Sequence, residues 1–364
     1  MKRAVPVLLL VLAACATPAT QRPAVPSQAT DEEARIQLAL AFNRRMDMLD
    51  QLWGVNYRLG AAASDLCGDH VARASGVLVR VAASFEEQSR PAALARYPAL
   101  GDAPTVVSIA PGSAAEAAGL ARNDVITTVN GEPIATTGKP LEAYAALVRK
   151  APDGPLRLAV QRAGETRDVT LDPQRICDYP AIIVDKPEVN AATDGKSIQV
   201  YRGMMDFVRS DDELALVLGH EMAHDLRGHL AAQRKNAAVG TVVGAVFDVL
   251  LGAATGVVGN TFSNMGGRLT AGAYSQDFEA EADYVGLYVM ARAGYDFHDA
   301  VTVWRRMAVN SPGAITMASD HPATSERFVA LQAAIQEIDA KVAQGQKLLP
   351  NEQGSATTAA AAKP

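Results

Sequence analysis

The chain has 364 residues, enough for two domains that each bury a core of their own. Its 40 Asp and Glu outnumber its 34 Lys and Arg, and the formal net charge is −6. This balance argues against a nucleic-acid partner, because binding to phosphates requires a basic surface.

The first residues have the features of a secretory signal. A basic start is followed by an apolar run, Val5 to Ala14, that is too short to span a membrane. The sequence Leu12-Ala13-Ala14-Cys15 is similar to the lipobox at which bacterial lipoproteins are cleaved and lipidated. We expect a signal peptide over 1–14 and a lipid on Cys15; an ordinary signal peptide with an incidental cysteine is the alternative. Ala16, rather than Asp, favours the outer membrane.

Two segments follow this signal. Residues 15–30 are rich in Pro, Ala and Thr and predict a disordered tether. Over 31–84 we predict a helical segment, because apolar side chains between Ile36 and Trp53 recur at helical spacing. This helix would pack on the domain formed by residues 176–343.

Short β-like runs separated by turn residues occupy 85–175. Residues 111–131 read PGSAAEAAGLARNDVITTVNG, and a helix at 141–150 and strands at 156–159 and 168–171 follow. The pattern resembles a PDZ domain of the bacterial protease-associated type. Such domains bind an extended peptide at a sheet edge. We place a nest for the peptide carboxylate near 97–101 (YPALG); the alternative is a domain that only gates its neighbour.

Cys67 and Cys177 flank this β-rich segment. An exported protein resides in an oxidising compartment, so we predict a disulfide between them that closes a long loop and pins the base of the domain. Two free buried thiols are the alternative.

Residues 189–200 are predicted to form a strand, a turn at 194–195 and a second strand. The stretch from Leu214 to His229, which follows, reads LALVLGHEMAHDLRGH. His220 and His224 are four residues apart, so a helix would point both imidazoles at one spot. Two imidazoles suit Zn²⁺. Glu221 can reach a metal-bound water as a general base. On this motif alone, a chance match in a buried helix remains the alternative.

A third ligand distinguishes the classes of zinc hydrolase. The metzincin motif needs Gly at 227 and His at 230, and those positions hold Arg227 and Leu230. The gluzincin class instead takes a Glu from a later helix. Residues 276–286 read QDFEAEADYVG, in which Glu279 and Asp283 share a helical face.

We assign separate roles to the acids of this second motif. Glu279 would bind zinc, and Asp283 would accept a hydrogen bond from a ligand histidine and fix its tautomer. Glu281 points to another face and is the second choice as a ligand; a solvated surface acid is the favoured interpretation of it. Small Ala282 and Gly286 would let this helix approach the histidine helix closely.

HEMAH, EAEAD, and then Asp320-His321-Pro322 with Arg327 stand in this order and at plausible spacing. Together they resemble the HtpX-like and CAAX-prenyl-protease group of zinc endopeptidases, peptidase family M48, over about 187–331. The resemblance implies an α+β chain: a mostly helical gluzincin domain over 176–343 with a small edge sheet, and an inserted β-rich PDZ domain. It implies one Zn²⁺ per chain, on His220, His224 and Glu279.

The resemblance also implies roles near the metal. In zinc peptidases of this kind an edge strand beside the metal helix holds substrate in extended form, and the candidates are Ser197, Ile198, Gln199 and Val200. His321 would face the zinc, either donating to the oxyanion or occupying the open coordination position.

Two stretches remain. Residues 237–258 are apolar with glycines at small-x-x-x-small spacing, but Asp248 at their centre argues against a transmembrane helix. We expect a helical hairpin or lid near the site. The tail over 344–364 lacks apolar periodicity and is predicted to be disordered.

The combined prediction is a zinc metalloendopeptidase of the bacterial cell envelope, lipid-anchored at the outer membrane and facing the periplasm. Its expected partners are the membrane, through Cys15, and protein or peptide substrates, in particular misfolded or misassembled proteins that the PDZ domain captures or gates. The alternative is a periplasmic chaperone or assembly factor with little turnover. The oligomeric state is left open.

Overall fold

The structure is a computed structural model. It describes residues 20, 23–239, 241, 245, 261–310 and 325–352. Cys15 and His321, which have predicted roles, lie outside these residues, as does most of the apolar segment over 237–258.

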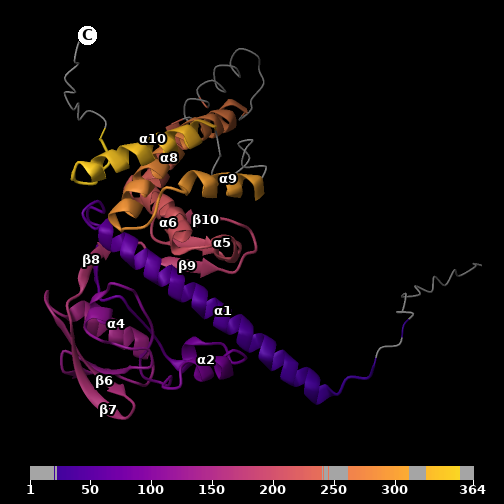
Figure 1. Ribbon diagram of the computed structural model, residues 1–364, viewed down its shortest axis with the longest axis vertical. Coiled ribbons are helices and arrows are strands. Elements are labelled where there is room, and N and C mark those ends of the chain that lie inside the picture. The colour runs from indigo at the N-terminus through magenta and orange to yellow at the C-terminus, as the bar shows by residue number, and fades with distance from the viewer. Residues whose placement is uncertain are drawn as a thin grey trace, which may run out of the picture.

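One long helix, α1 (Ser27–Ala62), runs between two bodies of different composition (Figure 1). A β-rich body lies on one side of α1, and a helical body with a small sheet lies on the other (Figure 1). The α+β class predicted from the sequence is therefore confirmed.

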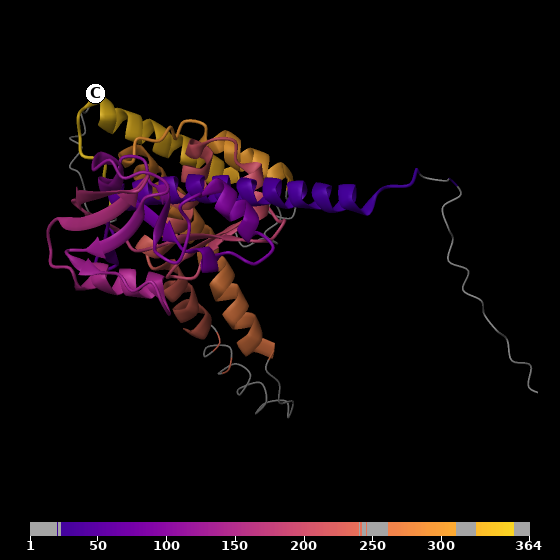
Figure 2. The ribbon, with the colours of Figure 1, turned by 90° about the horizontal axis from the view of Figure 1, so that it is seen from below.

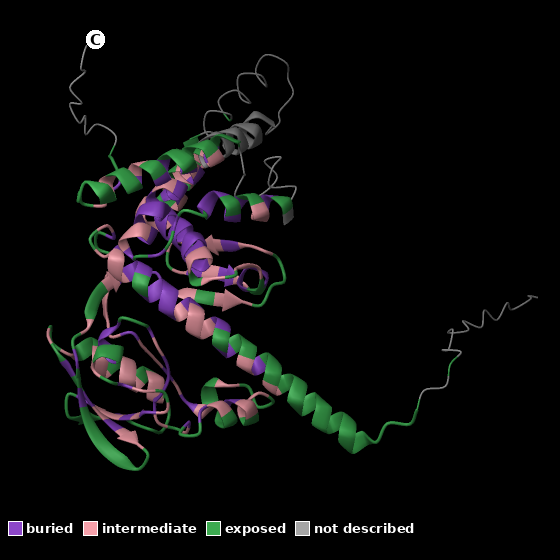
Figure 3. Cartoon of the chain, in the orientation of Figure 1, coloured by how far each residue is buried: buried purple, intermediate pink, exposed green. Residues whose placement is uncertain are grey.

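The predicted helical segment over 31–84 is helical up to Ala62, where α1 ends. The first half of α1, residues 27–41, is almost entirely exposed and projects from the rest of the molecule (Figures 2 and 3). The buried residues of α1 all lie from Phe42 onwards, and this part bonds to both bodies. Three side chains donate to main-chain carbonyls: Trp53 Nε1 to Gly76 at 3.0 Å, Asn56 Nδ2 to Tyr179 at 3.1 Å and Arg58 Nη2 to Gly294 at 3.1 Å.

The β-rich body is built on an antiparallel sheet of six strands in the order β2-β3-β4-β6-β7, with β5 paired to β4. The strands are β2 (Val77–Arg80), β3 (Thr105–Ile109), β4 (Val125–Val129), β5 (Glu132–Pro133), β6 (Leu156–Arg162) and β7 (Glu165–Leu171). The helical elements are η1 (Ala82–Ser84), α2 (Arg90–Arg96), α3 (Ala114–Ala117) and α4 (Pro140–Lys150). Alternate side chains of the strands form a separate apolar core, which is how a pleated sheet with one covered face buries its residues.

This body begins earlier in the chain than the predicted boundary at residue 85. Strand β2 pairs with β3, and β1 (Val71–Ala74) pairs with β8 (Gln174–Cys177), so 71–80 is extended rather than helical. The alternating valines of VARASGVLVRV favour strands. The β1–β8 ribbon is the stalk of the β-rich body, and Cys67 and Cys177 form a disulfide at its base with Cα atoms 5.6 Å apart.

The stretch at 97–101 does not form the predicted carboxylate nest. Tyr97 and Leu100 are buried against Phe42 of α1. The Tyr97 amide donates to Ala93 O at 2.8 Å and the Leu100 amide to Tyr97 O at 2.9 Å. These two amides already have partners in α2 and in the loop and are not available to a ligand, so the structure does not support that prediction.

The helical body contains a three-stranded sheet in the order β10-β11-β9. Its elements are β9 (Ala181–Val184), β10 (Ala191–Thr193), β11 (Ile198–Tyr201), α5 (Arg202–Phe207), α6 (Asp211–Leu226), α8 (Thr261–Arg292), α9 (Ala300–Asn310) and α10 (Ser325–Ala343). Strand β11 is antiparallel to β10 and parallel to β9. The sheet and helices enclose the largest core, to which α1 also contributes.

Helices α6 and α8 approach each other closely at a pair of glycines. A Cβ atom added at Gly286 would lie 2.9 Å from the main-chain carbon of Gly219 and 2.9 Å from the amide nitrogen of His220. Ala282, one turn earlier, is fully buried. The expectation that small residues here allow close approach is confirmed.

The predicted disordered tail begins with residues that are ordered in the structure. Residues 344–352 pack on the helical body: Lys341 Nζ donates to Leu349 O at 2.8 Å, and the Asn351 amide donates to the Tyr284 hydroxyl at 3.0 Å. The remainder of the predicted disordered tail lies outside the described residues. Among the helices that the structure describes, none has both the length and the apolar character needed to cross a bilayer.

The close contact between α6 and α8 predicts that adding one methyl group at Gly286 lowers the stability of the protein. Gly286→Ala should destabilise the protein by about 1–3 kcal/mol, because the added Cβ meets main-chain atoms that cannot rotate away. Gly101→Ala is the control, since no atom lies within 4 Å of a Cβ built there. Urea unfolding measures both, and equal stability of the two variants would contradict this packing.

His298 should make a pH-dependent contribution to stability. Its Nδ1 lies 2.6 Å from Asp296 Oδ1 and its Nε2 3.1 Å from Asp339 Oδ1 on α10. The hydrogen bond to Asp296 raises the pKa of His298; burial lowers it, and the hydrogen bond to Asp339 raises it again, so the net shift is upward. A raised folded pKa gives stability that is fully present below the unfolded pKa of about 6.5 and lost as pH rises through the folded pKa.

We therefore expect His298→Gln to lower the unfolding free energy more at pH 5.5 than at pH 9. The difference should be at most about 1 kcal/mol, because the side chain is 56% exposed and solvent screens exposed pairs. Urea unfolding of both proteins at both pH values measures it. A deficit that is the same at both pH values would show that the ion pairs do not contribute.

Candidate metal centre

Helix α6 carries the histidine motif, and its sequence explains where it starts and why it is buried. Ser210 caps it, its Oγ accepting from the Glu213 amide at 3.2 Å, and the first turn is acidic, which suits the positive end of a helix. Every residue from Leu214 to His224 is buried. The predicted buried helix is thus confirmed, and it holds both imidazoles rigidly inside the core.

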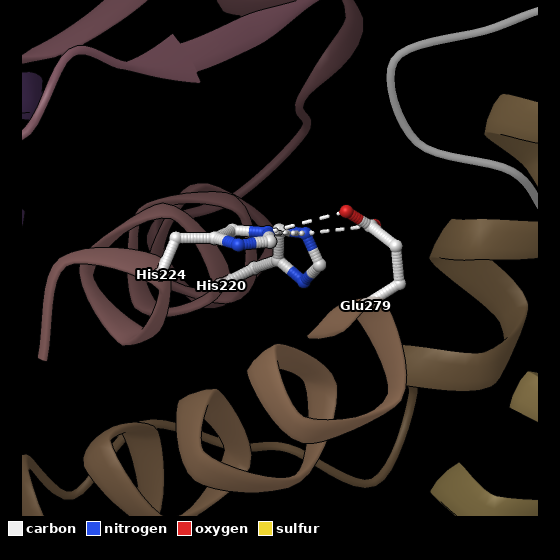
Figure 4. A group of neighbouring side chains, drawn as sticks. All are labelled: His220, His224 and Glu279. Atoms are coloured by element: carbon white, nitrogen blue, oxygen red, sulfur yellow. Dashed lines mark hydrogen bonds and ion pairs between the residues drawn. The ribbon is translucent and has the colours of Figure 1, made fainter. Parts of the chain in front are cut away.

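His220, His224 and Glu279 meet at one point (Figure 4). The Nε2 atoms of the two rings are 3.1 Å apart, and each lies 3.3 Å from an oxygen of the Glu279 carboxylate. All the facing atoms lie within 4.8 Å of one another, and all three residues are buried. The structure therefore brings the three predicted ligands together, two from α6 and one from α8.

Asp283 lies one turn beyond Glu279 on α8 and faces the far side of the His220 ring. Its Oδ1 is 3.0 Å from His220 Nδ1. Arg327 of α10 forms a fork on the same carboxylate, with Nε–Oδ2 at 2.8 Å and Nη2–Oδ1 at 2.9 Å, and its Nη1 lies 3.2 Å from Glu279 Oε2. Burial raises the pKa of Asp283, but Arg327 and His220 lower it by more than burial raises it. The net shift is downward, so the carboxylate stays ionised.

The electrostatics of this group favour a cation. Burial lowers the pKa of His220, yet its hydrogen bonds to Asp283 and Glu279 outweigh burial and raise the pKa to about 10. Burial and the charge on His220 lower the pKa of His224. The carboxylates thus favour one positive charge between the rings, which a divalent metal ion would supply without a proton.

The donor set fits a catalytic zinc site. Two imidazoles and one carboxylate are the three protein ligands of several zinc hydrolases, in which the fourth position is open to water or substrate. Because Asp283 accepts from His220 Nδ1, the lone pair of Nε2 is directed at the metal position. Glu221 directly follows His220 on α6 and is buried, and its charge opposes the effect of burial by raising the pKa of His224.

His229 is a buried neighbour of this group that sequence reasoning missed. Its Nδ1 is 2.9 Å from His224 Nδ1, and its Nε2 is 3.0 Å from Glu281 Oε2. Spacing along a helix did not reveal it because α6 ends at Leu226, and Gly228 with φ of +65° turns the chain back. The available signal was a third histidine just after a helix-ending glycine.

Asp225 was also missed, although it directly follows His224. Thr193 Oγ1 of β10 lies 2.7 and 2.6 Å from its two carboxylate oxygens. Burial raises the pKa of Asp225 to about 7, against the hydrogen bond from Thr193, which lowers it. This bond fixes β10 beside the metal helix.

The predicted substrate strand needs correction. Residues Ile198, Gln199 and Val200 belong to β11, and Ser197 lies in the turn before it. Strand β11 is the centre of its sheet, with β10 on one side and β9 on the other, so its main-chain groups face protein on both sides. Among the described strands, β10 is the edge that lies next to α6.

The comparisons with known proteins agree with this geometry. Residues 159–335 match the model for peptidase family M48, and residues 105–162 match the model for the PDZ domain. The predicted resemblance to peptidase family M48 is therefore confirmed over residues 159–335. The predicted PDZ domain is confirmed as well, and it corresponds to the β-rich body.

Three relatives show how far the likeness to metallopeptidases extends. It is 32% identical over 141 residues to the mitochondrial metalloendopeptidase OMA1 of Saccharomyces cerevisiae, covering 37% of this chain and 39% of the relative. It is 34% identical over 146 residues to the metalloprotease LoiP of Escherichia coli K12, covering 38% and 56%. It is 31% identical over 122 residues to the beta-barrel assembly-enhancing protease of Escherichia coli O157:H7, covering 31% and 25%. The chain thus spans about half or less of the relatives it matches.

Asp283→Asn should weaken metal binding. The amide can still accept from His220, but the negative charge that polarises the ring and pairs with Arg327 is lost. We expect zinc affinity, measured by competition with a chelator of known affinity, to fall about 10–100-fold. Asp277→Asn removes an exposed charge from the same helix and should leave the affinity unchanged; a similar loss in both variants would contradict the role of Asp283.

Proposed function

We propose that this chain is a zinc-dependent metalloendopeptidase. The observation that carries the proposal is the buried convergence of His220, His224 and Glu279 within 4.8 Å, with Glu221 next to the first ligand on the same helix. A structural zinc would take a fourth protein ligand and would need no base. In the described part of the chain the metal group has three members.

The residues divide the chemistry between them. The two imidazoles and Glu279 would hold zinc, which would supply a Lewis acid and lower the pKa of the attacking water. The Glu221 carboxylate takes the proton from the attacking water and passes it to the nitrogen of the leaving amine. Asp283 and Arg327 hold His220 in the tautomer that presents Nε2 to the metal.

Strand β10 supports extended binding of the substrate. It is an edge of its sheet among the described strands, and Thr193 ties it to Asp225, directly after the ligand His224. An added strand bonds through main-chain groups and so accepts many side chains. Such tolerance suits an endopeptidase that cuts misfolded or misassembled proteins, with the PDZ domain capturing or gating them.

The compartment is part of the same proposal. A disulfide at the base of the PDZ stalk suits an oxidising environment, and the lipobox-like sequence ending at Cys15 suits a lipid anchor. We place the protein in the bacterial cell envelope, anchored at the outer membrane with its catalytic domain in the periplasm.

Zinc content and casein cleavage, measured on wild type and Glu221→Gln, test the enzymatic assignment. Both proteins carry Cys15→Ser to remove the predicted lipid. We expect about one zinc per chain in both, since Glu221 is not a ligand, and cleavage at least 10²-fold slower in Glu221→Gln because the general base is lost.

Chelation followed by zinc addition is the control, and it should abolish and restore cleavage by wild type. Absence of zinc from wild type would overturn the metal assignment. Zinc in both proteins with equal cleavage would remove Glu221 from the mechanism. Zinc in both with no cleavage in either would contradict the peptidase and favour a chaperone or assembly factor.

A further inference from the structure

We propose that His229 and Glu281 are positioning residues for the metal ligand His224; the inference rests on the proposed zinc site. The Nε2 atom of His224 faces His220 and Glu279, and its Nδ1 atom faces His229 Nδ1 at 2.9 Å. His229 is therefore on the side of the ring away from the metal position. It does not belong to the group of candidate ligands.

When His224 holds a metal, the donor and the acceptor are fixed in both hydrogen bonds of His229, the one to His224 and the one to Glu281. A metal on Nε2 requires the ring proton of His224 on Nδ1, where it donates to His229 Nδ1. An acceptor at Nδ1 leaves the proton of neutral His229 on Nε2, which donates to Glu281 Oε2 at 3.0 Å. The carboxylate thus sets the tautomer of His229, and His229 sets the tautomer and the plane of His224.

The surroundings of His229 hold the ring in one place. It is 1% exposed and stacks on Phe278, with ring centroids 4.6 Å apart and planes 18° from parallel. Phe278 and Glu281 both belong to α8, so the same helix that provides the ligand Glu279 also fixes the support of His224. A buried imidazole with both nitrogens bonded is not a surface histidine.

Glu281 is itself held, although its side chain is 46% exposed. Arg227 Nε lies 3.6 Å from Glu281 Oε1, and Arg227 Nη2 lies 2.9 Å from Glu352 Oε1 in the packed part of the tail. The support of His224 therefore extends from α6 through α8 to the end of the described chain. His220 has a shorter arrangement, a direct bond to Asp283.

Two substitutions of His229 separate positioning from packing. His229→Phe keeps an aromatic ring for Phe278 and removes the acceptor of the His224 proton. His229→Asn keeps an acceptor near the position of Nδ1 and loses the ring. The readout is the zinc affinity of the folded chain, measured by chelator competition, with circular dichroism to confirm folding before zinc is added.

We expect His229→Phe and Glu281→Ala to weaken zinc binding about 10–100-fold and His229→Asn to retain most of the wild-type affinity. Asp277→Ala, which removes an exposed acid from the same helix, should match wild type. The inference would be overturned, with the zinc site left intact, if His229→Phe bound zinc as tightly as wild type. It would also be overturned if His229→Phe and His229→Asn lost zinc affinity equally. A wild-type chain that binds no zinc would instead overturn the proposed function.

Discussion

The metal centre depends on how closely α6 and α8 pack. Side chains from two helices can share one metal ion only if the helices lie close together, and here Gly219 and Gly286 lack the side chains that would separate them. A Cβ atom built at Gly286 would lie 2.9 Å from both the Gly219 carbonyl carbon and the His220 amide nitrogen, so the spacing of the helices and the position of the first candidate ligand are set together. Glycine is costly inside a helix, and this approach is the reason to retain it at both positions.

Once the helices are in place, one stretch of α8 serves three purposes. Glu279 faces the metal position, Asp283 faces His220, and Glu281 faces His229. Two of these carboxylates are buried, and buried like charges are costly unless they are paired. Arg327 contacts both, which links α10 to the metal centre and explains why an arginine far along the chain belongs to the site.

Local spacing was enough to pair His220 with His224 and Glu279 with Asp283, because residues four apart on a helix share a face whatever the rest of the chain does. That Glu279 joins the two histidines was implied by the resemblance to a known family. Local spacing was not enough for features that depend on chain reversal or distant pairing. His229 follows a glycine with positive φ, where helical periodicity no longer applies. The centre of the small sheet was mistaken for its edge because β9, the partner of β11, precedes it by a connection whose course the sequence does not reveal. Leu349 and Asn351 likewise gain their contacts only once Lys341 and Tyr284 are placed.

Helix α1 makes the two bodies thermodynamically interdependent. Within two helical turns it bonds to Gly76 of the PDZ domain and to Tyr179 and Gly294 of the peptidase domain. Isolated helices are marginal in water, so α1 needs both bodies in order to stay ordered. Unfolding of either one removes partners that the other relies on. The cooperative unit is therefore larger than either domain. Any ligand that bound the folded PDZ domain would also stabilise, through α1, the body that holds the candidate metal centre.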